Sequence, residues 1–360
     1  MKVALVHDWL NTLGGAERVL IELHHIFPNA PIYTLFYNKE FKEKYLFNAE
    51  IRPSYLQKFP FINKHYKYAA LLMPSAIESF DLADFDMVIS SSAFFSKGLV
   101  LRPKTRHICY CYSPTRQLWD RQFEYTSKSI LTKLSQHLLR IWDRQAADRV
   151  DEFIAISETV RSRIQKYYKK DAKVIYPPAT ELPEGSSDRP IKEEYYLIVS
   201  RLFRHKNIDV AIDAFNKLGY KLVIIGDGPE YAKYKGQISK GKAKNIQLLG
   251  RLDDNSVATY YRHAKAFIMP QEEDFGLTPI EAMRFGIPTL ALRKGGAMET
   301  LLESITGEFF DDPIPEALAD GVRRLNENFH NYKPNLIKLR ADNFSKEIFK
   351  KEIENFIKFQ

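Results

Sequence analysis

The sequence predicts an α/β fold built from two doubly wound domains. Short apolar runs typical of strands alternate with amphipathic helical patterns along the chain, as in parallel sheets covered by helices. A turn-rich connector near the middle divides this alternation into two series. The length of 360 residues is enough for two domains of ordinary size.

The first half opens with a strand, a loop and a helix. The apolar run 2–7 leads to a loop with Gly14 and Gly15, and apolar residues then recur at helical spacing. This helical face consists of Val19, Leu20, Leu23, Ile26 and Phe27. A helix is also expected to begin near Ser157. The further strands expected in this half are 87–92, 106–112 and 153–157.

The second half repeats this plan after the proline-rich connector 173–190. Its expected strands are 195–200, 221–226, 246–250, 266–270 and 288–293. We therefore expect two Rossmann-like domains, over 1–177 and 178–342, with a cleft between them. An amphipathic helix over 343–360 is expected to pack on one domain and is a candidate to complete the first. Its apolar face consists of Phe349, Ile353, Phe356 and Ile357.

Composition and charge narrow the class of protein. No apolar run is long enough to span a bilayer and the first residues lack the features of a signal peptide, so a cytoplasmic location is expected. The formal net charge of +8 favours an anionic partner. Zinc-finger spacing, RNP signatures and long basic blocks are absent from the sequence, so no nucleic-acid partner is expected. Cys109 and Cys111 are interpreted as reduced, structural thiols.

A loop with carboxylates follows the expected strand 266–270. It holds Glu273 and Gly276, and Glu281 lies in the helix that comes next. Open α/β sheets bind ligands at the carboxyl ends of their strands, and free N–H groups at a helix start favour phosphate. Carboxylates beside such a site are expected to accept hydrogen bonds from neutral hydroxyls such as those of sugars.

Glu281 also has a structural interpretation. Thr278, followed by Pro279 and then by Glu281, is typical of a capping box at a helix start. In that case Glu281 would serve only to close the first turn of the helix.

Two cations follow the first strand of the same domain. Arg201 and Lys206 lie five residues apart in the loop after the strand 195–200, where two converging cations would suit a diphosphate. A solvated loop of charges is the alternative. In the first domain, the Gly14-Gly15 pair at a helix start is a second place where backbone can approach phosphate or sugar, although it is not a dinucleotide fingerprint.

With these motifs the chain resembles the glycogen-synthase-like retaining glycosyltransferases, the family 4 class with the GT-B architecture of two Rossmann-like domains. The resemblance covers nearly the whole chain, and the family's spacing of seven residues separates Glu273 from Glu281. It implies transfer of a hexose from a nucleotide sugar, with no other cofactor. The stretches that carry it are HDWL with GGAERVL, VSRLFRHKNIDVAIDAF, VIIGDGPE, LLGRLDD and EEDFGLTPIEAMRFGIPTLALRKGGAMET.

The resemblance implies a role for each residue of these motifs. Arg201 and Lys206 would bind the donor diphosphate and stabilise the leaving group, and Glu273 would contact the donor sugar beside the reacting carbon. Glu281 would accept hydrogen bonds from the nucleotide ribose. The other donor-binding residues that the resemblance implies are Gly14, Gly15, Arg251, Phe275, Gly276, Leu277 and Thr278.

Residues 55–92 and 111–120 look most like bacterial members that assemble surface polysaccharides, including lipopolysaccharide. Many of those are mannosyltransferases that use GDP-mannose, so a glycan or lipid-linked saccharide is the implied acceptor. Relatives often carry His-Thr-Pro or His-Ser-Pro where this chain has Tyr112-Ser113-Pro114, so Tyr112 must substitute for a histidine or the step must proceed without it. The implied acceptor-side residues are Asp8, Tyr112, Arg116 and Trp119.

An Asp-x-Asp pair, Asp84-Phe85-Asp86, resembles the metal-binding pairs of other glycosyltransferases. Its flanks are typical of a helix-to-strand turn, and protein cations can supply the positive charge, so no metal site is expected. Two other functions stay open. A sugar-nucleotide epimerase of the same fold would form product without an acceptor, and a non-catalytic nucleotide-sugar-binding module would leave the donor intact.

Two stretches of the first domain combine basic and apolar residues, namely 55–68 and the expected helix 127–142. One interpretation is peripheral contact with anionic lipid on the inner face of a membrane, near a lipid-linked acceptor. The other is a helix packed on its own sheet with a solvated basic edge. The apolar residues on one side of this helix are Ile130, Leu131, Leu134, Leu138, Ile141 and Trp142.

Overall fold

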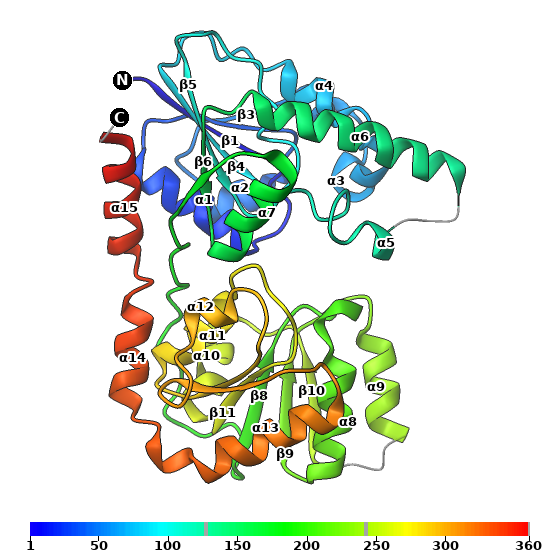
Figure 1. Cartoon of the computed structure of the whole chain (residues 1–360), viewed down its shortest axis with the longest axis vertical. Coiled ribbons are helices and arrows are strands. Elements are labelled where there is room, and N and C mark those ends of the chain that lie inside the picture. The colour runs from blue at the N-terminus through cyan, green and yellow to red at the C-terminus, as the bar shows by residue number, and fades with distance from the viewer. Residues whose placement is uncertain (126–128, 241–243, 359–360) are drawn as a thin grey trace. The chain divides into compact units, whose positions relative to one another are not determined.

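The computed structural model describes residues 1–125, 129–240 and 244–358 (Figure 1). The chain divides into two compact units. We call Met1–Pro178 with Phe349–Gln360 the N-terminal unit and Ala179–Ile348 the C-terminal unit. The sequence predicts this junction after residue 177, one residue earlier.

The described part of the N-terminal unit builds a parallel sheet of seven strands in the order β3-β2-β1-β4-β5-β6-β7. Three of the four longest strands lie within the expected runs, and β6 begins one residue before its run. The short β2, β3 and β7, of three residues each, were not expected. The strands are β1 (Val3–His7), β2 (Ile32–Thr34), β3 (Ile51–Pro53), β4 (Met87–Ser92), β5 (Arg106–Cys111), β6 (Glu152–Ala155) and β7 (Ala172–Val174).

Helices cover this sheet. Ser157 caps the helix that was expected to begin there, because its side chain accepts a hydrogen bond from the N–H of Val160. Cys109 and Cys111 are free, buried thiols on β5, as expected. The helices are α1 (Gly15–Ile26), α2 (Lys39–Tyr45), η1 (Tyr55–Lys58), α3 (Ile62–His65), η2 (Tyr66–Ala69), α4 (Met73–Glu78), α5 (Gln122–Tyr125), α6 (Ile130–Asp148) and α7 (Glu158–Tyr168).

The described part of the C-terminal unit builds a parallel sheet of six strands in the order β10-β9-β8-β11-β12-β13. All five strands expected in this half are present, and β13 is an additional one. The strands are β8 (Tyr195–Val199), β9 (Lys221–Ile225), β10 (Ile246–Gly250), β11 (Ala266–Met269), β12 (Thr289–Leu292) and β13 (Gly307–Phe310). The helices are η3 (Arg204–Lys206), α8 (Ile208–Leu218), α9 (Tyr231–Lys240), α10 (Asp254–His263), α11 (Leu277–Arg284), α12 (Ala297–Thr300), α13 (Pro315–Glu327), η4 (Phe329–Asn331) and α14 (Pro334–Asp342).

The two strand orders confirm the doubly wound α/β fold in each unit. In both sheets the chain order reverses once, between β1 and β4 in the first and between β8 and β11 in the second. Such a topological switch point leaves a crevice at the carboxyl ends of the two strands, where ligands bind. The fold therefore directs attention to the loops that follow these strands.

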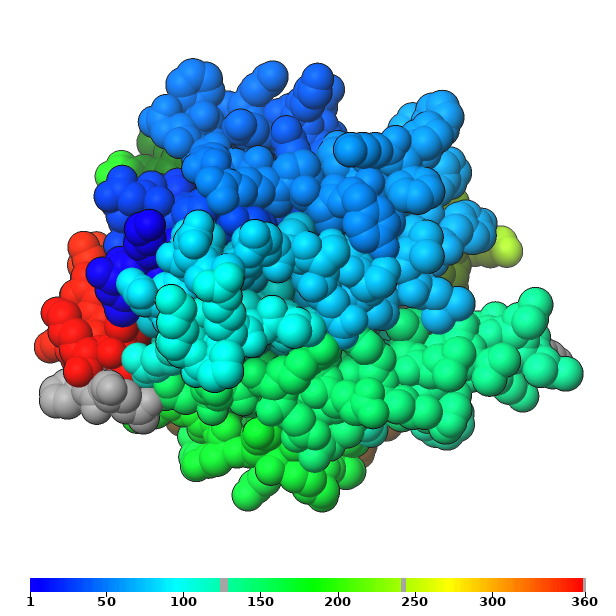
Figure 2. Space-filling model, turned by 90° about the horizontal axis from the view of Figure 1, so that it is seen from above, coloured from blue at the N-terminus to red at the C-terminus, as the bar shows by residue number. Residues whose placement is uncertain are grey.

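The helix expected over 343–360 is present as α15 (Lys346–Lys358), and α14 precedes it. Residues 359–360 lie outside the described part of the chain. From α15, Phe349 packs edge-on against Tyr110 with ring centres 5.8 Å apart, and the backbone carbonyl of Ile357 accepts a hydrogen bond from Arg106. Figure 2 shows the atoms of α15 next to those of the first residues of the chain. This helix thus packs on the N-terminal unit.

Candidate active site

Lys206 and Glu273 meet at the switch point of the C-terminal sheet. Lys206 ends η3 in the loop after β8, Glu273 lies in the loop after β11, and the ammonium donates a hydrogen bond to Oε1 of Glu273. Gln271 donates to the same oxygen at 3.0 Å. Asn207 ties the two loops together, because its side-chain amide donates to the carbonyl oxygen of Pro270 at 3.0 Å. The structure therefore brings Lys206 and Glu273 together at one edge of this sheet.

Glu273 is held as a carboxylate. Its burial favours the neutral acid, but the charge of Lys206 and the hydrogen bonds from Lys206 and Gln271 outweigh burial and hold the pKa of Glu273 below its ordinary value. An ionised carboxylate only accepts hydrogen bonds, so its free lone pairs suit sugar hydroxyls.

A glycine pair after β12 supports the backbone of Glu273. A Cβ on Gly295 would come within 2.2 Å of the carbonyl oxygen of Glu273, and a Cβ on Gly296 within 2.3 Å of the Cα of Phe275. Gly296 also donates its N–H to the Glu273 carbonyl at 2.9 Å. The sequence analysis did not include this pair in the site, although Gly296 caps α12 and a Gly-Gly pair at a helix start is the pattern that singled out Gly14 and Gly15.

Arg201 is exposed in the loop after β8. Its guanidinium lies 5.5 Å from the ring centre of Phe203, and it reaches into solvent beside η3. Arg251 is also exposed and follows β10, at the same carboxyl edge of the sheet. Both positions leave the guanidinium groups accessible to an anionic ligand.

The helix α11 begins earlier than expected, and the capping-box interpretation of Thr278 is wrong. Gly276 occupies the cap position with φ +90°, a backbone conformation that favours glycine, and the helix starts at Leu277. Thr278 is therefore already inside the first turn. The N–H groups of this turn lie directly after the Glu273 loop, as a phosphate or sugar site at a helix start requires.

Glu281 is buried on the side of α11 that faces α10. Its Oε2 accepts a hydrogen bond from the hydroxyl of Tyr261 at 3.1 Å. It also lines a cavity of about 430 Å³, together with Arg262, Arg284 and Lys338. Phe275 is buried as well, and packs edge-on against Phe344 with ring centres 5.6 Å apart. The side chain of Phe275 is thus part of the core, which leaves its backbone for ligand contact.

In the N-terminal unit, Gly14 and Gly15 form the start of α1, after β1. Gly14 is the cap residue, and its N–H donates to Oε2 of Glu17 at 2.8 Å. The other oxygen of Glu17 lies 3.6 Å from Nε2 of the buried His7. The glycine loop is thereby fixed to the end of β1.

Asp8 holds the loop after β4. Its Oδ2 accepts hydrogen bonds from the N–H groups of Ala93 and Phe94 at 2.8 and 2.9 Å, and its Oδ1 accepts from those of Phe95 and Ser96 at 2.6 and 2.8 Å. The side chain is almost fully buried. This carboxylate therefore positions the loops at the first switch point.

Tyr112 links three elements of the same unit. Its hydroxyl donates to the carbonyl oxygen of Ala16 at 2.9 Å and lies 2.8 Å from Oγ of Ser91, which in turn lies 3.0 Å from Nδ1 of His7. Burial raises the pKa of Tyr112 well above its ordinary value, so the phenol stays protonated. Tyr112 is thus placed to anchor the glycine loop, and it does not exchange a proton near neutral pH as a histidine would.

Arg116 and Trp119 follow β5. Arg116 pairs with Asp120 at 3.1 Å, and the indole N–H of Trp119 donates to Oδ2 of Asp143 at 2.7 Å. Asp143 forms a fully buried ion pair with Lys97 at 2.6 Å. Sequence reasoning missed this buried pair, because its residues lie 46 positions apart in unrelated patterns.

The Asp84-Phe85-Asp86 stretch precedes β4. Asp86 accepts a hydrogen bond from the backbone N–H of Lys2 at 2.7 Å. Within residues 1–125, 129–240 and 244–358, no group of three or more His, Cys, Asp or Glu side chains is arranged to hold a metal ion.

Comparison with known proteins defines the enzyme class. Residues 13–179 match the family model described as Glycosyltransferase Family 4, and residues 183–338 match the model described as Glycosyl transferases group 1. The chain belongs to the glycosyltransferases, with a family 4 domain followed by a group 1 domain.

Its relatives include mannosyltransferases. The alpha-1,3/1,6-mannosyltransferase of Kluyveromyces lactis is 23% identical over 99% of this chain and 84% of its own length. That of Candida glabrata is 24% identical over 99% of this chain and 93% of its own length. An uncharacterized glycosyltransferase of Methanocaldococcus jannaschii is 27% identical over 52% of this chain, and the match spans 53% of that relative.

Solved structures with the same fold cover nearly the whole chain. Sucrose-phosphate synthase of Thermosynechococcus elongatus has a TM-score of 0.77 at 16% identity, covering 99% of this chain and 98% of the other. Anabaena HepE in complex with UDP and glucose has a TM-score of 0.74 at 17% identity, covering both chains fully. A lipopolysaccharide outer core galactosyltransferase has a TM-score of 0.68 at 18% identity, covering 99% of each. The expected GT-B fold is confirmed.

Proposed function

We propose that this glycosyltransferase is a retaining enzyme that transfers mannose from GDP-mannose to a glycan or lipid-linked saccharide in polysaccharide biosynthesis. The observation that carries the proposal is the Lys206–Glu273 pair at the switch point of the C-terminal sheet. The mannosyltransferase names of relatives that match 99% of this chain support mannose as the sugar.

The pair provides both kinds of group that the reaction needs. When the bond between the anomeric carbon and the phosphate oxygen breaks, its electron pair goes to the departing diphosphate and the sugar becomes oxocarbenium-like. Lys206, Arg201 and the first N–H groups of α11 are the donors for the negative charge that develops. Glu273 is an anion beside these donors. Its carboxylate would accept hydrogen bonds from sugar hydroxyls and stabilise the positive charge that develops on the sugar ring.

Glu281 would bind the ribose. Tyr261 uses one lone pair of its Oε2 and fixes the orientation of the carboxylate. The cavity beside it is lined by three cationic side chains, Arg262, Arg284 and Lys338, and by a second carboxylate, Glu184. Because protein cations would neutralise the charge of the diphosphate, we propose that transfer needs no bound metal ion.

A panel of nucleotide sugars tests the donor. GDP-mannose should raise the melting temperature more than UDP-glucose or ADP-glucose, and transfer should yield the α-anomer that GDP-mannose itself carries. Anabaena HepE was solved with UDP-glucose, so stronger stabilisation by UDP-glucose would replace the proposed donor while keeping the reaction class. A product with inverted configuration would overturn the retaining assignment.

The same assay separates the other two functions. An epimerase would convert the donor sugar with no acceptor present, and a binding module would return intact donor after incubation with lipid-linked and soluble saccharides. Formation of a glycosidic bond that depends on an added acceptor supports the transferase.

A further inference from the structure

The helix α6 presents a row of apolar side chains to solvent. These residues recur at helical spacing on one face. Of the six apolar residues named in the sequence analysis, Trp142 packs against the core, and the interpretation that this face packs on its own sheet is wrong for the other five. The side of α6 that does pack is a different one, with Asp143, Ala146 and Ala147 buried. The row, which we call the apolar stripe, consists of Ile130 (82% exposed), Leu131 (77%), Leu134 (53%), Leu138 (51%) and Ile141 (45%).

A second set of exposed apolar residues lies in the segment from η1 to α4. Phe61 is 73% exposed, and its φ of +60° is in the left-handed region, which is uncommon for a bulky residue. Strained backbone of this kind is a pointer to function rather than to packing. The set, which we call the aromatic segment, consists of Phe59, Phe61, Tyr68, Leu71 and Leu72.

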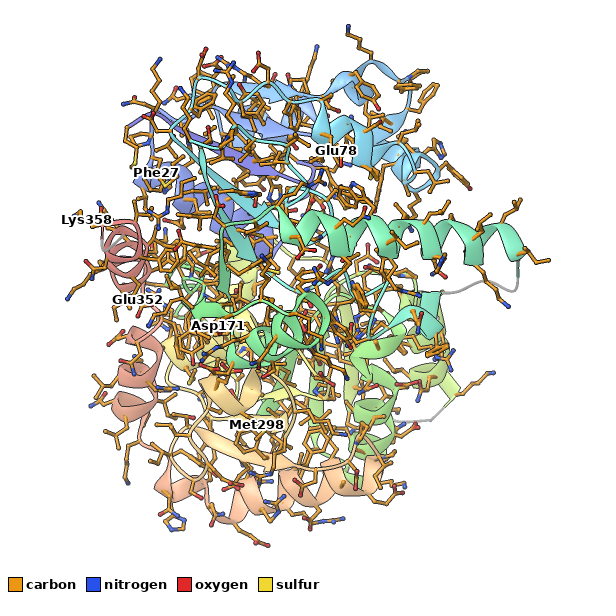
Figure 3. The ribbon with its side chains drawn as sticks, turned by 45° about the horizontal axis from the view of Figure 1, so that its top comes forward. Phe27, Glu78, Asp171, Met298, Glu352 and Lys358 are labelled. Atoms are coloured by element: carbon orange, nitrogen blue, oxygen red, sulfur yellow. The ribbon has the colours of Figure 1, made fainter. Side chains whose placement is uncertain are left out.

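The apolar stripe and the aromatic segment belong to neighbouring elements. The indole N–H of Trp142 in α6 donates to Glu78 of α4 at 2.8 Å, and Leu139 and Trp142 pack against the core cluster that contains Ile62 and Met73. Figures 1 and 2 show α6 beside α3 and α4, and Figure 3 labels Glu78 next to α6. Both sets therefore belong to one region of the N-terminal unit.

The two stretches that carry the exposed apolar residues have basic side chains as their charged groups. Residues 51–77 and 129–142 contain no Asp or Glu, although one residue in eight along the chain is acidic. Exposed cations lie among the apolar side chains, namely Lys58, Lys64 and Lys67 near the aromatic segment and Lys133 on α6. Such a surface is complementary to a negatively charged partner with an apolar interior.

We propose that the apolar stripe and the aromatic segment dock this protein on a bilayer that contains anionic phospholipid. Apolar and aromatic side chains would enter the boundary between headgroups and acyl chains, and the lysines would contact the anionic headgroups. A second copy of the chain is a poorer occupant because it would bring lysines against lysines. Protein interfaces in general are depleted of lysine.

This inference stands apart from the proposed function, since it needs no donor or acceptor. The inference adds a location to the proposed function, because a lipid-linked acceptor has its saccharide at the level of the headgroups. Among the helices within the described ranges, none combines the length and apolar character needed to cross a bilayer.

Vesicle co-sedimentation of the whole protein tests the proposal. Vesicles of phosphatidylglycerol with phosphatidylcholine should bind the protein, and vesicles of phosphatidylcholine alone should bind it at least about tenfold more weakly, since each lysine near an anionic surface adds attraction. Binding should fall strongly at about 1 M salt, where the Debye length is near 3 Å. Equal binding to both vesicles, or none to either, overturns the proposal.

Two independent pairs of substitutions locate the surface. Leu131→Gln with Leu134→Gln removes part of the apolar stripe, and Lys64→Glu with Lys67→Glu reverses charge beside the aromatic segment. Each pair should weaken vesicle binding about tenfold or more.

Matched controls lie elsewhere on the chain. Leu336→Gln with Leu339→Gln changes two leucines of α14 that are 50% and 63% exposed, and Lys350→Glu with Lys351→Glu reverses charge on α15. Both controls should bind vesicles like the unchanged protein, with the same melting temperature. Binding that survives both test pairs contradicts the proposal, and so does a dimer that the leucine pair dissociates. Loss of vesicle binding with intact transfer to a water-soluble acceptor would separate this surface from the catalytic proposal.

Discussion

Lys206 and Glu273, 67 residues apart in the chain, form a hydrogen-bonded ion pair between the loops that follow two adjacent strands, β8 and β11. Nothing local to either residue brings them together. The pairing follows from strand order, because β8 and β11 are parallel neighbours at the point where the order of the strands reverses, and both of their loops leave the sheet at the same edge.

Arg201→Ala should weaken binding of the nucleoside diphosphate far more than binding of the nucleoside. Arg201 is exposed beside η3, and its guanidinium is expected to donate hydrogen bonds to the diphosphate and not to the base. Isothermal titration with GDP and guanosine measures the difference. Arg204→Ala, an exposed arginine three residues away, is the control and should change neither affinity. Equal losses for GDP and guanosine would count against a diphosphate clamp.

Glu281→Gln should lower affinity for the donor about tenfold, because a hydrogen bond to a charged acceptor contributes about 1.5 kcal/mol. The amide can still accept from Tyr261, so the fold should be kept. Tyr261→Phe is the matched variant. It removes the 3.1 Å hydrogen bond and should cost about 1 kcal/mol of unfolding free energy with little loss of donor affinity. If Glu281→Gln lowers stability but leaves donor binding unchanged, the role of Glu281 is structural.

The pH dependence of stability should reveal the charge state of Glu273. Its pKa is lower in the folded protein than the ordinary 4.5, so its contribution to stability is present above that value and is lost as pH falls through the lower folded pKa. The difference in unfolding free energy between the unchanged protein and Glu273→Gln should therefore be constant at higher pH and shrink below 4.5. Lys206→Met removes the main group that lowers the pKa of Glu273, while burial still raises it. NMR of the side-chain carboxyl should therefore report a higher pKa for Glu273 in this variant. A pKa unaffected by this substitution would show that Lys206 does not set it.

Asp8→Ala should lower the free energy of unfolding by about 2 kcal/mol or more, because four backbone N–H groups lose a charged acceptor. Denaturant unfolding measures this loss. Asp81→Ala, on an exposed turn, should cost much less, since its side chain accepts one hydrogen bond from the described residues, from the N–H of Ala83. A stable Asp8→Ala protein with weakened acceptor binding would instead give Asp8 a direct contact with the acceptor.

Much of the fold could be predicted because its longer strands are continuous apolar runs between turn residues. The three-residue strands β2, β3 and β7 could not, since three residues hold too little pattern to separate a strand from a loop. The start of α11 was misplaced for a related reason. Thr278 and Pro279 look like the first residues of a helix, but the positive φ of Gly276 lets the helix begin before them.

The site was predictable where charged residues follow strands, as at Lys206 and Glu273. It was not predictable where contacts join distant segments, as in the pair of Lys97 with Asp143 or the four amides around Asp8. Helical periodicity correctly grouped the apolar residues of α6 on one face. It could not show that this face is exposed, because a stripe that packs on a core and one that meets a membrane have the same spacing.

The most direct measurement of the central claim is the turnover of Glu273→Gln at saturating donor. The amide keeps the size of the side chain and leaves the Glu273 carbonyl bonded to Gly296, so the fold and donor-induced stabilisation should persist. Transfer should fall by about two to three orders of magnitude, as for loss of one preorganised electrostatic group. The neighbouring Glu272→Gln serves as control and should keep most of the activity. Near-normal turnover in a folded Glu273→Gln protein would contradict the claim that Lys206 and Glu273 form the centre of the active site.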